Sequence, residues 1–163
     1  MDLLPTNAAH WHLVLNHLPI VGSLAALLLV AWGFIKNTDE SKRIALTAQV
    51  LVALVSIPAF LTGEPSERFL KGLPGISKRA MSAHEDLAEK ALWLAIITGA
   101  AALGVSLFFR KTRSIPRWTM GVLLLLTLTM CGAMWWAGKE GGRIRHSEIR
   151  SYSTPENPAD VEH

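Results

Sequence analysis

The stretch LPIVGSLAALLLVAWGFI, residues 18–35, contains no charged side chain. A helix needs about 17–25 such residues to cross the hydrocarbon core of a bilayer. Residues 44–63, 91–109 and 118–138 form three more charge-free stretches of this kind. Because 50% of the 163 residues are hydrophobic and so many of them are gathered in these stretches, the sequence predicts four transmembrane helices.

The connections between these stretches predict how the helices pair. Residues 36–43 and 110–117 are short and polar, so each should join two neighbouring helices as an antiparallel hairpin. The expected fold is therefore an all-α, four-helix transmembrane bundle with antiparallel, up-down-up-down topology. It covers residues 8–150, and the polar segment 151–163 is expected to be a disordered C-terminal tail.

The third connection, residues 64–83, is longer and mixes apolar with basic side chains. This composition predicts a short interfacial helix between the second and third spans, broken at Pro74 and Gly75. Ser82 and Glu85 have the spacing of a capping box, which would start the third long helix there.

Charge predicts the orientation of the bundle. The net charge is +3, and the two short connections carry seven basic residues but only two acidic ones. The basic residues are Lys36, Lys42, Arg43, Arg110, Lys111, Arg113 and Arg117, and the acidic ones are Asp39 and Glu40. The positive-inside rule makes these loops cytoplasmic and places both termini on the periplasmic or extracellular side. Membrane topology accounts for the basic residues, so nucleic acid is not an expected partner. The start of the chain has an acidic and no basic residue, so no cleaved signal peptide is expected.

All six histidines fall on the side of the membrane predicted to carry the termini. Ionisable residues at membrane depth are rare and usually functional. His17 and His84 should lie at similar depth on two different helices, which is what the axial ligands of a b-type haem require. We therefore expect His17 and His84 to be the axial pair, with His12 and His146 as substitutes.

Other residues on that side have matching candidate roles. Arg143 and Arg145 could bind haem propionates if Gly141–Gly142 lets the chain fold back, although lipid phosphate or water would also satisfy them. Trp93 and Trp136 could line a cofactor pocket or simply anchor the membrane interface. Asn16, Glu64 and Glu85 are candidates for orienting the ligand imidazoles.

Two prolines, Pro19 and Pro58, fall in the same half of the predicted membrane region. If the first helix begins near His10, Pro19 leaves the carbonyl of Leu15 without its donor and kinks that helix. If the helix begins later, Pro19 lies in an ordinary first turn.

Four segments resemble a family of small bacterial four-helix membrane proteins known mainly as a domain of unknown function. They are HLVLNHLPIVG, TGEPSE, HEDLAEKALW and GGRIRHSEIR, and the resemblance covers about residues 8–150. It implies a four-span bundle in the bacterial inner membrane and, through the histidine-rich start with His12, His17 and Pro19, suspected haem binding.

The sequence favours a b-type haem electron-transfer subunit, which would exchange electrons with a quinone and with other respiratory-chain subunits. A copper or zinc site on the same histidines is an alternative. Further alternatives are a quinone-contacting or proton-handling site and a non-catalytic accessory subunit of a larger complex. The chain has no nucleotide-binding glycine loop, and independent enzymatic activity is not expected.

Overall fold

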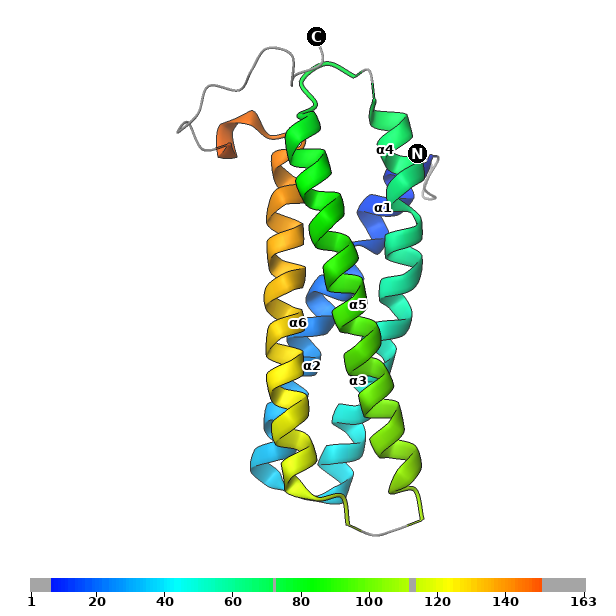
Figure 1. Ribbon diagram of the computed structural model, residues 1–163, viewed down its shortest axis with the longest axis vertical. Coiled ribbons are helices and arrows are strands. Elements are labelled where there is room, and N and C mark those ends of the chain that lie inside the picture. Colours follow the sequence, from blue (N-terminus) through cyan, green and yellow to red (C-terminus); the bar gives the residue numbers. More distant parts are fainter. Residues whose placement is uncertain (1–6, 72, 112–113, 151–163) are drawn as a thin grey trace, which may run out of the picture.

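The computed structural model describes residues 7–71, 73–111 and 114–150, so the predicted tail, 151–163, lies outside the described residues. Within these ranges the chain is helical and forms no strand (Figure 1). The elements are α1 (Ala8–Leu15), α2 (His17–Lys36), α3 (Asp39–Leu61), α4 (Gly63–Leu70), α5 (Lys78–Phe108), α6 (Arg117–Arg143) and the short 3₁₀ helix η1 (Ser147–Ile149).

Four helical stretches of the described chain are long and apolar enough to cross a membrane, as the sequence predicts. They are Ala8–Lys36, Asp39–Leu70, Lys78–Phe108 and Arg117–Arg143. The first consists of α1 and α2, and the second consists of α3 and α4. Large apolar side chains cover the outside of these helices, including Leu28, Leu54, Leu107 and Leu125.

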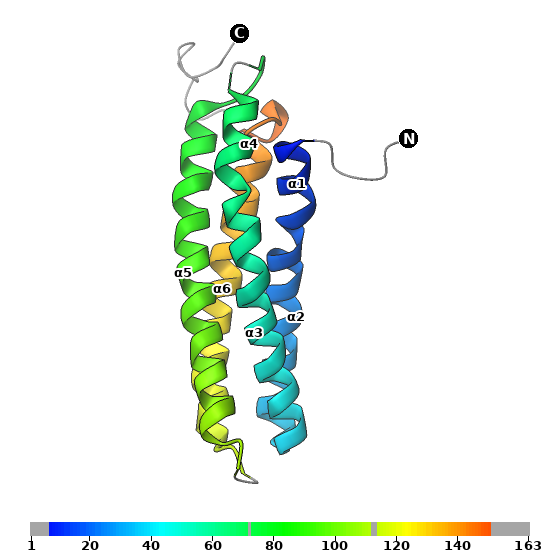
Figure 2. The same cartoon turned by 90° about the vertical axis from the view of Figure 1, so that its right-hand side faces the viewer.

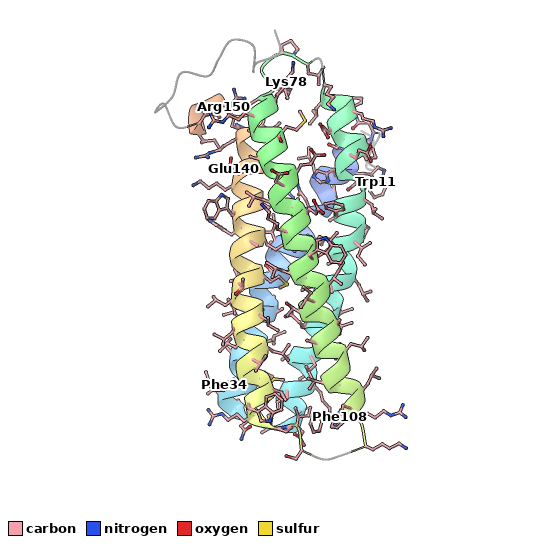
Figure 3. The ribbon with its side chains drawn as sticks, viewed as in Figure 1. Trp11, Phe34, Lys78, Phe108, Glu140 and Arg150 are labelled. Carbon is pink, nitrogen blue, oxygen red and sulfur yellow. The ribbon has the colours of Figure 1, made fainter. Side chains whose placement is uncertain are left out.

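The long helices form an elongated bundle in which α2 and α5 each pack against both α3 and α6 (Figures 1 and 2). The α2–α3 and α5–α6 connections lie at one end, called here the lower end. The start of α1, the α4–α5 connection and the end of α6 lie at the other, the upper end. Figure 3 marks the lower end by Phe34 and Phe108 and the upper end by Lys78 and Arg150.

Small and polar side chains allow close packing inside the bundle. Gly99 of α5 lies so near α3 that a Cβ there would overlap the Cβ of Ala53. Gln49, the only amide in the charge-free stretches, is fully buried. Its Nε2 donates to Met130 Sδ at 3.4 Å, and its Oε1 accepts from Thr127 Oγ1 at 3.2 Å. Each polar group is thus paired with one from another helix, as a buried polar group must be.

The first span is interrupted near the upper end. The chain is helical from Ala8, but α1 ends at Leu15 and α2 begins after Asn16, so Pro19 lies in the first turn of α2. Because proline has no N–H, the carbonyl of Leu15 loses its donor at this point. The interruption turns α1 away from the axis of α2, and α1 packs against α4 (Figure 1).

The connection between the second and third spans differs from the prediction in the place of its helix and in the start of the third long helix. Its helix, α4, begins at Gly63 directly after α3 and continues upward along the bundle (Figure 2). The predicted start of the third long helix at Ser82 is wrong. Helix α5 begins at Lys78, and the side chain of Ser77 accepts from the N–H of Ala80 at 3.3 Å. The serine nearer the Pro74–Gly75 turn therefore caps the helix, and Ser82 lies inside it.

A charged cluster joins the two loops of the lower end. Asp39 Oδ1 accepts from the N–H of Ile115 at 2.9 Å, and the buried ammonium of Lys42 donates to the carbonyl of the same residue. Lys42 Nζ also lies 4.0 Å from Asp39 Oδ1. The sequence assigned these charges to topology alone, but the structure shows that Asp39 and Lys42 also hold the α5–α6 connection to the start of α3.

Candidate functional site

Two histidines meet in the upper half of the bundle. The rings of His12, from α1, and His84, from α5, have centroids 6.2 Å apart and planes at 79°. Both side chains are half-buried. Trp11, which precedes His12 in the sequence, marks the position of α1 in Figure 3.

The ring of His12 is held by the end of α3. His12 Nδ1 lies 3.1 Å from the carbonyl oxygen of Ala59 and 3.1 Å from Thr62 Oγ1. The last carbonyls of a helix lack intrahelical donors, and α3 ends only two residues after Ala59. The hydroxyl of Thr62 also donates to Ala59 at 2.8 Å. The end of α3 therefore offers His12 an acceptor that a continuous helix would not.

The ring of His84 is held by α6. His84 Nδ1 lies 2.8 Å from the carbonyl oxygen of Ala137. This approach requires Gly141, because a Cβ at that position would come within 3.1 Å of both Cε1 and Nδ1 of His84. Gly141 thus forms a cradle for the imidazole, and a Cβ there would force the ring to shift by a few tenths of an ångström.

These contacts determine the tautomer of both rings. A backbone carbonyl can only accept, so Nδ1 of each histidine carries the hydrogen, and Nε2 of each neutral ring carries a lone pair. Metal-ligating histidines almost always have this arrangement, in which the second ring nitrogen donates to a carbonyl or carboxylate. Backbone carbonyls, rather than the carboxylates of Glu64 and Glu85, orient these two rings.

A buried acceptor without a donor lies at the interruption of the first span. Asn16 Oδ1 is buried and has no hydrogen-bond partner among the described residues. Such an atom is rare in folded proteins, and a water or an ion is among the partners that usually satisfy it. It lies four residues after His12 in the sequence, on the turn that connects α1 to α2.

The remaining histidines of the described residues lie elsewhere. His17 is exposed, and its Nδ1 lies 2.6 Å from the carbonyl oxygen of Leu13. His10 is exposed on α1. His146 is exposed beside η1, with Nδ1 2.7 Å from Glu148 Oε1. The N–H of Glu148 and the His146 ring hold the pKa of the Glu148 carboxyl below its usual range. The structure therefore brings His84 together with His12 and leaves His17 on the surface.

The predicted propionate and pocket residues have the following places. Arg143 ends α6 and pairs with Glu140 at 2.8 Å, whereas Arg145 is exposed beyond the helix. Trp93 and Trp136 are 56% and 59% exposed, respectively, on the outside of the bundle. These exposed positions on the outside of the helices are not those of pocket walls, and interface anchoring stays a prediction.

The chain does fold back at the upper end, but not at the glycines. Gly141 and Gly142 lie inside α6, and the reversal begins at Ile144, whose carbonyl accepts from the N–H of Ser77 at 3.0 Å. Arg150 fastens this segment, because its guanidinium donates to the carbonyls of Arg143, Ile144 and Gly75, each at 2.9 Å. No sequence pattern predicted this role of Arg150.

A scan against protein-family models, a search of the curated proteins and a search of the solved structures find no match to this chain. The resemblance to a family of bacterial membrane proteins therefore stays a prediction. Residues 7–71, 73–111 and 114–150 contain no group of three or more His, Cys, Asp or Glu side chains placed to hold a metal ion. The pair formed by His12 and His84 is therefore the candidate functional site.

Proposed function

We propose that this protein is a membrane-embedded b-type haem carrier for electron transfer, with His12 and His84 as the axial ligands. The observation that carries the proposal is that the two imidazole rings have the same tautomer, with the hydrogen on Nδ1. His12 donates Nδ1–H to a carbonyl of α3 and His84 donates Nδ1–H to a carbonyl of α6, and each ring keeps a lone pair on Nε2. Two neutral imidazoles from facing helices of a bundle are the donor set that a bis-histidine haem requires.

The number of ligands favours haem over a bare metal ion. Structural zinc sites use four protein ligands and catalytic ones three, but no such group exists in the described part of the chain. Haem iron needs only two protein ligands, since the porphyrin supplies four nitrogens. His12 and His84, whose ring centroids lie 6.2 Å apart, would be these two protein ligands.

When bound, the haem supplies a one-electron iron couple, and the chain supplies the rest of the site. The carbonyls of Ala59 and Ala137 fix the two rings, and Gly141 leaves room for one of them. Of the two arginines predicted to bind the propionates, Arg145 is the one that no carboxylate contacts in the described structure. It is exposed above α6, and we assign it to the propionates.

The proposal places the four spans antiparallel in a bilayer, with the upper end periplasmic. From Ile35 to His17 a helix rises about 27 Å, close to the hydrocarbon thickness of about 30 Å. His12 then lies at the boundary with the headgroups. Exposed tryptophans lie near both boundaries of this region, as in an aromatic belt. They are Trp135 and Trp136 at the upper boundary and Trp32 and Trp118 at the lower one.

The orientation can be tested with single cysteines, because the chain has one native cysteine, Cys131. In a Cys131→Ser background, Ser114→Cys should be protected from a membrane-impermeant maleimide in intact cells and react after lysis. Arg145→Cys should react in intact cells. The reverse pattern would contradict the periplasmic placement of the site, and labelling of both cysteines in intact cells would contradict membrane insertion.

Haem titration tests the proposed cofactor. Protein purified in detergent should bind one haem per chain, and the reduced-minus-oxidised spectrum should show the sharp α and β bands of six-coordinate, low-spin haem b. Absence of these bands after expression with ample haem would overturn the proposal. Metal analysis of the same sample would then show whether copper or zinc occupies the histidines instead.

The cradle at Gly141 predicts a specific defect. Gly141→Ala introduces a Cβ 3.1 Å from the His84 ring, so the imidazole must move away from Ala137. A change in the support of a ligand typically lowers affinity about 10–100-fold, and we expect a loss of haem affinity in this range. The matched control is Gly132→Ala on the same helix, where a Cβ meets nothing within 4 Å. Equal haem affinity of the two variants would show that the ring does not need the cradle.

A further inference from the structure

A single polar side chain interrupts the apolar outer surface of the first span. From Trp11 to Trp32, every exposed side chain except one is apolar. The exception is His17, and its neighbours on this surface include Leu13, Val14, Leu18 and Val21, which are 49–64% exposed. On the membrane placement proposed above, His17 lies at the edge of the hydrocarbon and faces lipid.

The hydrogen bonding of His17 determines what it can bind. Its Nδ1 lies 2.6 Å from the carbonyl oxygen of Leu13, so this nitrogen is the donor. The neutral ring therefore presents Nε2 as an acceptor. A polar group facing hydrocarbon is costly when it lacks a partner, and a matching ligand must donate a hydrogen bond and reach the site from within the bilayer.

We propose that His17 is the headgroup contact of a quinol-binding site on the lipid-facing surface of the first span. A quinol carries hydroxyl donors on an apolar ring, and it reaches proteins through the bilayer. One hydroxyl donates to His17 Nε2, and the ring lies on the apolar side chains of Leu13, Leu18 and Val21. The phosphate of a phospholipid does not match this site, because its oxygens are acceptors, as Nε2 is.

This site deepens the proposed function and rests on its membrane placement. His17 is five residues from His12, about 7 Å of helix rise or less. An electron donor bound there would lie beside the proposed haem ligand. The two sites use different histidines, so each can be tested in the absence of the other.

The test is equilibrium binding of decylubiquinol to the protein in phosphatidylcholine nanodiscs, with empty nanodiscs as the reference for partition. We expect saturable binding by the wild type, and binding about tenfold weaker for His17→Leu, the usual effect of losing one hydrogen bond. His17→Gln keeps an acceptor and should restore most of the affinity. His10→Leu removes another exposed histidine of the same span and should leave the affinity unchanged.

Two further measurements make the assignment specific. Decylubiquinone, which only accepts hydrogen bonds, should bind more weakly than the quinol. The His84→Ala protein without haem should still bind the quinol, so that failure of the haem proposal leaves this test intact. Equal affinity of the wild type and His17→Leu, or no saturable binding by the wild type, would overturn the proposal. Displacement of the quinol by phosphatidylethanolamine at His17 would assign the site to a lipid headgroup and would also overturn it.

Discussion

Replacing either His12 or His84 by alanine should abolish the six-coordinate haem spectrum, while replacing His17 should leave it intact. Each of the first two substitutions removes a ring whose Nδ1 is fixed by a carbonyl and whose Nε2 is free to ligate. Loss of a direct ligand should exceed the roughly 10–100-fold effect of losing the support of a ligand. We therefore expect haem affinity to fall by at least about 100-fold in both variants, measured by titration of the apoprotein.

His10→Ala and His17→Ala are the controls, because they remove exposed histidines from the same span. Both should bind haem with wild-type affinity and spectrum. If His17→Ala loses the spectrum and His12→Ala keeps it, the axial pair is His17 and His84, as predicted from the sequence, and the proposed pair of His12 and His84 is wrong. Circular dichroism of each variant distinguishes loss of the ligand from loss of the fold.

The second large effect is expected at the lower end, where Asp39→Leu should destabilise the bundle by about 2–3 kcal/mol. The substitution removes the acceptor for the N–H of Ile115 and leaves the ammonium of Lys42 buried without a counter-charge. Lys42 is buried whereas Asp39 is partly exposed, and removing the partner of a buried charge is costly because that charge remains. Unfolding of the protein in mixed micelles, followed by circular dichroism, measures the change in the free energy of unfolding.

Glu40→Leu provides the matched control. Glu40 is the neighbouring acid in the first turn of α3, but its side chain is exposed, so its loss should cost no more than about 0.5 kcal/mol. The double variant Asp39→Leu, Lys42→Met should regain part of the stability lost by Asp39→Leu, because it removes the unpaired charge. Equal destabilisation by Asp39→Leu and Glu40→Leu would show that the cluster does not hold the loops together.

The charge-free composition and the length of the apolar stretches were enough to predict the four long helices, because the hydrophobic requirement of a span depends only on composition and length. The start of α5 was not predictable in the same way. Both Ser77 and Ser82 precede suitable helical sequence, and the choice depends on the contact of Ser77 with Ile144 from the far end of the chain. A capping pattern alone cannot report such a contact.

The candidate site could likewise be predicted only in part from the sequence. The clustering of histidines at one end, and the place of His84 among them, could be predicted from the order of the spans. The partner of His84 could not, because it depends on the interruption at Asn16, which tilts α1 towards α4 and brings His12 to the end of α3. Treating residues 10–35 as one regular helix makes His17 the nearer candidate. The sequence signal for the interruption is Pro19, whose missing N–H weakens the turn before it.

The most direct test of the central claim is the electron paramagnetic resonance spectrum of the oxidised protein, purified from cells supplied with a haem precursor. Ligation by His12 and His84 predicts a low-spin ferric signal. Because the two ring planes are at 79°, this signal should be of the strongly anisotropic type that near-perpendicular axial imidazoles produce. A high-spin ferric signal, a cupric signal or no haem signal at all would contradict the proposed pair of ligands.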